Sequence, residues 1–336
     1  MYTEQIKNSI FVSNIIKMKR VVSLLFFALL LNGCDDGDLV LEDISFENTE
    51  IKNCVNNNIF YKLENTKVLL LEMDKTLLPS ESTPIDNPKI IELVSPNRVV
   101  YRFYNGIPAV DNICETIPPL TPVATDQWNA TAGKIEIITT AKKEVDLVNN
   151  SSKIVGYNHN VTFKNITFAT STVPVTYESL NFGNYSTNLT TSVPSTFGTA
   201  LKQCPSSKQI YINTSSEALT LDIDPDLLVS TPTPLNEPRT GLISATKNKL
   251  IYRVYSGLLT SDYFCTTPVP TTPVISQEWN AVAGISNVSG IVEVTTTTNG
   301  TGFKHTIVLK KVTMKKGNSD FLLGDNYIYG ELLTTN

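Results

Sequence analysis

Cysteine and histidine are the side chains of this chain best suited to covalent, redox or metal chemistry, and they are regularly spaced. Four of the five cysteines form two sets whose members stand 60 and 61 residues apart, Cys54 with Cys114 and Cys204 with Cys265. Cysteine thiols form disulfides in an oxidising compartment, or bind zinc where more ligands gather. The chain has no Cys-x-x-Cys, which disfavours zinc. The fifth cysteine, Cys34, has no counterpart.

His159 and His305 are the only histidines. Each stands in a strand-like pattern without a Ser, Cys or acidic motif, whereas nucleophilic catalysis requires a base and an orienting group. The sequence also lacks His-Glu-x-x-His, Gly-x-Ser-x-Gly and a glycine-rich phosphate loop. We therefore expect two polar strand residues, and we predict that the chain is not an enzyme and holds no cofactor.

Two further features admit a binding function. Asp222, Asp224 and Asp226 resemble a calcium-binding cluster, but the glycine of an EF-hand loop is missing, so we expect a solvated strand end and no metal site. Trp128 and Trp279, the only tryptophans, are 151 residues apart. An exposed Trp stacks on sugar rings, whereas a buried one packs in a core. The sequence favours the core and leaves ligand binding at both open.

These residues recur at similar spacings, between 146 and 151 residues, because the chain contains a tandem repeat. Residues 100–106 (VYRFYNG) match residues 251–257 (IYRVYSG), and residues 128–130 (WNA) match residues 279–281. The duplication assigns two cysteines to equivalent places in each repeat, so the simplest pairing is one disulfide per repeat. Each repeat is long enough to bury its own core. The predicted segments are a signal peptide at 1–33, a lipidated tether at 34–48, and repeats at 49–192 and 196–336.

Alternating polar and apolar residues predict β-strands throughout both repeats. Residues 134–140 (KIEIITT) and 291–295 (IVEVT) alternate, and clusters of Gly and Pro separate such runs. Residues 272–279 also fit a short capped helix, although a strand is favoured. The predicted fold class is all-β, with two tandem homologous antiparallel β-sandwich-like domains.

The N-terminus has the organisation of an export signal. Lys17, Lys19 and Arg20 precede an apolar run at 21–31, which is too short to span a bilayer. A start at Met18 would give a more usual signal length than a start at Met1. This organisation predicts an exported protein.

The residues that follow resemble those of bacterial lipoproteins. Residues 31–34 (LNGC) resemble a lipobox, which implies acylation of Cys34 and a lipid anchor in the membrane. Asp35, Asp36 and Asp38 resemble the acidic export signal of Bacteroidota lipoproteins, which implies transport to the outer face of the outer membrane. In other Gram-negative bacteria an Asp here implies retention at the inner membrane, and an ordinary signal peptide with a chance cysteine is the remaining alternative.

The body of the chain resembles small β-rich lipoproteins of flavobacteria, a resemblance that implies no activity. The net charge of −5 gives no reason to expect a nucleic-acid partner. We predict a non-enzymatic outer-membrane lipoprotein, exposed at the cell surface, with a structural role or an envelope protein as partner. The alternative is a carbohydrate- or nutrient-binding lipoprotein that assists an outer-membrane transporter.

Overall fold

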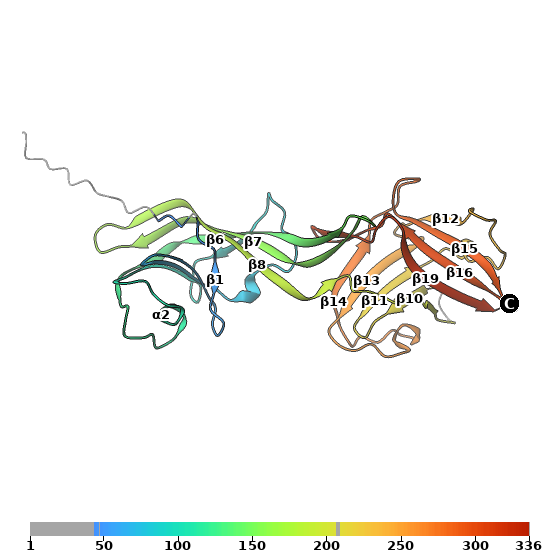
Figure 1. Ribbon diagram of the computed structural model, residues 1–336, viewed down its shortest axis with the longest axis horizontal. Coiled ribbons are helices and arrows are strands. Elements are labelled where there is room, and N and C mark those ends of the chain that lie inside the picture. Colours follow the sequence, from blue (N-terminus) through green and yellow to red (C-terminus); the bar gives the residue numbers. More distant parts are fainter. Residues whose placement is uncertain (1–43, 47, 206–208, 336) are drawn as a thin grey trace, which may run out of the picture. The chain divides into compact units, whose positions relative to one another are not determined.

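The computed structural model describes residues 44–46, 48–205 and 209–335 (Figure 1). The predicted signal peptide and most of the predicted tether lie outside them. From Phe46 onward the chain forms one compact unit, which is described below. None of its described helices has the length and apolar character needed to span a membrane. Below, residues 46–192 are called the first half and residues 196–335 the second half.

The first half is built on one eight-stranded antiparallel sheet. Its order is β1-β2-β3-β5-β6-β7-β8, and β4 pairs with β6. The strands are β1 (Lys52–Asn53), β2 (Ile59–Glu64), β3 (Lys67–Glu72), β4 (Lys89–Glu92), β5 (Arg98–Tyr104), β6 (Ala124–Asp146), β7 (Ser151–Ala169) and β8 (Val175–Val193).

The second half is built on two antiparallel sheets. One has the order β18-β17-β14-β13-β11-β10-β9, and the other has the order β12-β15-β16-β19. The strands are β9 (Lys202–Gln203), β10 (Gln209–Asn213), β11 (Glu217–Asp222), β12 (Arg239–Leu242), β13 (Lys249–Tyr255), β14 (Ile275–Ala281), β15 (Ile291–Asn299), β16 (Gly302–Lys310), β17 (Thr313–Lys316), β18 (Ser319–Leu322) and β19 (Tyr327–Thr335).

The two halves differ mainly in whether their sheets are continuous. β6 pairs with β5 near its start and with β4 further along, and the pairing with β7 shifts register on either side of Ala132. Such bulges bend a strand without ending it. In the second half the equivalent run is split into β14 and β15. Gly284 and Gly290 approach closely between them, where a Cβ on Gly284 would lie 2.4 Å from the Gly290 carbonyl oxygen.

Four short helical turns interrupt the strands. They are η1 (Lys75–Leu77), α2 (Val110–Cys114), η2 (Pro225–Leu227) and η3 (Tyr263–Cys265). α2 and η3 each end at a cysteine, and the sequence reasoning did not foresee either. The stretch that also fitted a capped helix forms β14 instead, as favoured.

The main apolar core draws on both halves. It contains second-half residues such as Leu221 and Trp279 together with Ile154, Tyr157 and Val193 from the ends of β7 and β8. The prediction of an all-β, antiparallel fold is confirmed. The division into two tandem domains stays a prediction, because the structure packs the end of the first half into the core of the second.

Candidate functional site

Both predicted disulfides are present. Cys54 bonds to Cys114 and Cys204 bonds to Cys265, with Cα–Cα distances of 5.5 and 5.2 Å. Each ties the residue after a short edge strand to the end of a helical turn, α2 or η3. These bonds stabilise the long loops that follow β5 and β13. The fifth cysteine, Cys34, and the predicted export residues Asp35, Asp36 and Asp38 lie outside the described residues.

The two tryptophans occupy equivalent strand positions but differ in burial. Trp279 is 0% exposed, and its ring lies 5.1 Å from that of Phe321. The Trp279 ring is therefore closed off from solvent and packs in the core, the interpretation that the sequence favoured. Trp128 is half-buried and packs edge-on against Tyr101 and Phe103, with centroid distances of 5.4 and 5.1 Å.

The difference arises from what covers the sheet at each place. β14 pairs with β17, and the β17–β18 hairpin brings Phe321 against Trp279. Lys316 also lies over the Trp279 ring, 5.8 Å from its centroid. Trp128 instead donates its indole N–H to Asp126, an exposed carboxylate, at 3.0 Å. Of the two predicted ligand-binding tryptophans, only Trp128 has access to solvent.

The two histidines have the same environment in both halves. His159 Nδ1 lies 2.9 Å from Thr139 Oγ1, and His159 Nε2 lies 3.0 Å from Thr187 Oγ1. His305 is flanked in the same way by Thr296 at 2.9 Å and Thr334 at 3.1 Å. A neutral imidazole has one donor and one acceptor, and two hydroxyls satisfy both.

Burial keeps the His159 imidazole neutral. The side chain is 1% exposed, and burial lowers its pKa to about 4. Burial is also the main cause that lowers the pKa of His305, and Arg239 adds to it. Thr139 has the hydroxyl–imidazole contact of a nucleophile with its base, but it is 0% exposed and out of reach of substrate. Both histidines are thus buried strand residues whose two ring nitrogens are hydrogen-bonded.

Of the suspected calcium cluster, Asp224 caps a helical turn, and Asp222 accepts a hydrogen bond from the Gln209 side chain. The Asp224 carboxylate accepts from the backbone N–H of Asp226 at the start of η2, and it forms an ion pair with Lys247. Asp74 caps η1 in the same way by accepting from the backbone N–H of Thr76 at 2.8 Å, a bond that lowers its pKa. Within the described ranges, no three His, Cys, Asp or Glu side chains gather as a metal site.

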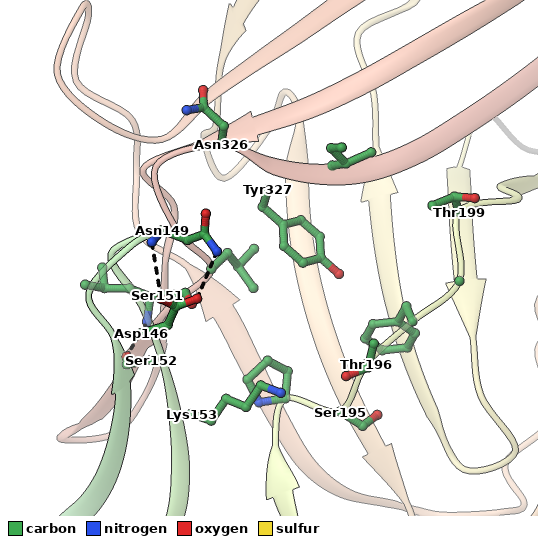
Figure 2. Close-up of a pocket in the computed structure, with 17 residues that line it drawn as sticks. Asp146, Asn149, Ser151, Ser152, Lys153, Ser195, Thr196, Thr199, Asn326 and Tyr327 are labelled. Atoms are coloured by element: carbon green, nitrogen blue, oxygen red, sulfur yellow. Dashed lines mark hydrogen bonds between the residues drawn. The ribbon is translucent and has the colours of Figure 1, made fainter.

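A cavity of about 420 Å³ lies where the halves meet (Figure 2). The β6–β7 turn, the 194–199 segment and the chain between β18 and β19 form its walls. Hydrogen bonds hold these walls together: Leu322 N donates to Ser152 Oγ at 3.0 Å, and Asp325 N donates to the Asn149 carbonyl at 2.8 Å. Pro194 and Ser195, which stand between the two predicted repeats, thus line this cavity.

Uncharged polar side chains and apolar side chains line the cavity together, and two of the lining residues, Phe197 and Tyr327, are aromatic. Figure 2 shows Tyr327 pointing into the space, with Thr196 and Lys153 on the facing side. Burial raises the pKa of Tyr327 to about 12, so its hydroxyl stays protonated and can donate. The carboxylate of Asp146 is held by its own turn, where the Val148 N–H and the Asn149 side chain lower its pKa.

The sequence contains no motif that predicts this cavity. Asn149, Asn326 and Tyr327 belong to turns or strand ends that are far apart in the sequence, and no motif connects them. A polar Pro-containing stretch between repeats gives no sign of packing. The arrangement can bind a small polar ligand by hydrogen bonds and by contact with the ring face.

Comparison of the chain with protein-family models, curated proteins and solved structures finds no match.

Proposed function

We propose that the chain is a non-enzymatic lipoprotein, anchored in the outer membrane through acyl chains on Cys34 and exposed at the cell surface, with a structural or partner-binding role. The two disulfides carry this proposal, because such bonds persist in oxidising extracytoplasmic compartments. The resemblance of residues 31–34 to a lipobox agrees with the same location. Two acyl chains suffice for stable anchoring.

The histidines support a non-enzymatic role. Both are buried, and each is held between two threonine hydroxyls that use both of its ring nitrogens. Neither has a solvent-facing nitrogen to act as a base. The proposal therefore gives the duplicated histidines a role in folding.

Protease treatment of intact cells tests the location. Wild-type protein should remain in the membrane fraction and be digested from outside. Cys34→Ala should release the protein from the membrane, and Asp35→Ala with Asp36→Ala should leave it anchored but protected. A wild-type protein that is membrane-bound yet protected would contradict surface exposure, and a membrane-bound Cys34→Ala variant would contradict the anchor.

Carbohydrate binding is a second candidate, and the junction cavity favours it. Sugar hydroxyls pair with amides and hydroxyls, and the face of an aromatic ring contacts the sugar C–H groups. Asn149, Thr196, Asn326 and Tyr327 offer this combination. Trp128, which does not line the cavity, offers a second aromatic surface.

Calorimetric titration of the protein with a panel of neutral oligosaccharides tests the second candidate. Tyr327→Ala should weaken binding at least about tenfold, which corresponds to about 1.4 kcal/mol. Trp128→Ala is the matched comparison and should leave the affinity unchanged if the cavity is the site. Absence of heat with every sugar would rule out this candidate and leave the location proposal intact.

A further inference from the structure

Within the described residues, β8 forms one edge of the eight-stranded sheet. Figure 1 shows it along the free margin of that sheet beside β7. Edge strands expose unpaired N–H and C=O groups and are usually protected by Lys, Pro or a covering segment. From residue 179 to 193, β8 contains neither a charged residue nor a proline.

The equivalent edge in the second half is covered. β8 and β19 correspond because Gly183 and Gly330 occupy the same bulge, with φ of 119° and 149°. Beside that bulge, Glu331 N donates to the Thr199 carbonyl at 2.7 Å, and Leu201 N donates to the Glu331 carbonyl at 3.0 Å. The 199–201 segment thus protects β19. In the first-half counterpart, residues 49–51, the Ile51 side chain lies against the bulge, 3.6 Å from where a Cβ on Gly183 would be, with Lys62 Nζ at 3.4 Å. Residues 49–51 form no backbone hydrogen bond with β8 in the described structure.

The backbone direction along β8 shows which groups face outward. The Thr187 carbonyl faces β7, where a Cβ on Gly156 would meet it at 2.0 Å. Strand residues alternate, so Asn184, Ser186 and Asn188 direct their N–H and C=O groups to the free edge. Within residues 48–205 and 209–335, no backbone partner reaches these three residues from that side. Their side chains are exposed.

The three outward residues of this edge, Asn184, Ser186 and Asn188, are symmetric about Ser186. Residues 184–188 read Asn-Tyr-Ser-Thr-Asn. A second β8 strand that runs antiparallel and is centred on Ser186 therefore places Asn opposite Asn and Ser opposite Ser. Asn184 Oδ1 accepts from Asn160 Nδ2 at 2.9 Å, which leaves the Asn184 amide group free to donate. Asn188 Oδ1 accepts from Lys142 at 3.2 Å and has a second lone pair.

We propose that β8 is the docking site for a second copy of this chain, paired antiparallel through β8 about a two-fold axis at Ser186. Asn184 then faces Asn188 of the partner subunit, donor to acceptor, and the outward backbone groups form a continuous ladder. No like charges face each other across the axis. The two eight-stranded sheets become one.

Sedimentation equilibrium of the full-length chain in mild detergent, together with cross-linking, tests the pairing. Wild type should be a dimer at micromolar concentration, and Ser186→Cys should cross-link to itself with a short bismaleimide. Ser186→Lys places two ammonium groups together at the axis and should shift dissociation at least tenfold towards monomer. Ser186→Pro removes an outward N–H without touching the bonds to β7, and should do the same.

Thr295 is the matched control, because it is exposed on the interior strand β15. Thr295→Lys should stay dimeric, and Thr295→Cys should not cross-link. A monomer at all concentrations up to about 100 µM would overturn the proposal, as would a dimer that Ser186→Lys leaves intact. A monomer that binds an extended foreign peptide along β8 would also overturn it, and would assign the edge to a different strand. Circular dichroism confirms that each variant is folded.

Discussion

Replacing His159 with Gln should change how the stability of the protein responds to acid. In the folded chain the imidazole is buried between two threonine hydroxyls, and burial lowers its pKa from 6.5 to about 4. The unfolded chain exposes the ring to water and restores the ordinary value. Between those two pH values the unfolded state binds more protons, so the free energy of unfolding falls as the pH falls.

The magnitude follows from the size of this gap. At about 1.4 kcal/mol per pH unit, the interval from 6.5 to about 4 corresponds to about 3 kcal/mol. The stabilisation is complete above pH 6.5 and is lost progressively as the pH falls to about 4. His305, whose pKa is lowered by the same cause, adds a loss in the same direction.

Urea unfolding at pH 7.5 and pH 4.5, followed by tyrosine and tryptophan fluorescence, measures the effect. His159→Gln keeps a side chain that can donate and accept hydrogen bonds but cannot gain a proton. Between pH 7.5 and pH 4.5, its free energy of unfolding should therefore fall by at least about 2 kcal/mol less than that of wild type. The carboxylates titrate equally in both proteins and cancel in the difference. Equal losses in wild type and variant would refute the assignment of a buried neutral imidazole.

Three more predictions concern stability. Trp279→Ala should lower the free energy of unfolding by about 3–5 kcal/mol, and Trp128→Ala should lower it less, because only Trp279 is fully buried; chemical denaturation compares them. Gly330→Ala should destabilise the protein, because its Cβ would lie 2.3 Å from the Thr199 carbonyl oxygen. Gly198→Ala is the control, because its Cβ would meet no atom within 4 Å. A melting temperature of Gly330→Ala equal to that of wild type would contradict this. Reducing both disulfides should lower the free energy of unfolding by about 3–5 kcal/mol for each loop closed, and an unchanged denaturation midpoint would count against that role.

Local pattern was enough to predict much of this fold. Alternation along residues 134–140 and 291–295 predicted strands that became parts of β6 and β15. The repeat predicted the two disulfides, because equivalent cysteines must occupy equivalent places. Such inferences succeed because the alternation of polar and apolar residues and the internal repeat can both be identified directly in the sequence.

The difference in burial between the two tryptophans was not predictable in this way. Their strands match, but Phe321 reaches Trp279 only because the β17–β18 hairpin folds over that sheet. The junction cavity depends likewise on contacts between distant segments, such as the bond from Leu322 to Ser152. Sequence patterns report which face of a strand is apolar and say nothing of which element covers it.

The sequence by itself determined the all-β class and the pairing of four cysteines, and it predicts an N-terminal lipid anchor on Cys34. Only the tertiary structure decided that Trp279 is inaccessible and that a cavity forms between the halves. It also decided that residues 199–201 cover the edge of β19, whereas no backbone segment of the described residues pairs with the edge of β8. The physical reason is that secondary structure and cross-linking follow from near-neighbour chemistry and repetition. Burial, cavities and open edges depend on packing between segments far apart in the chain.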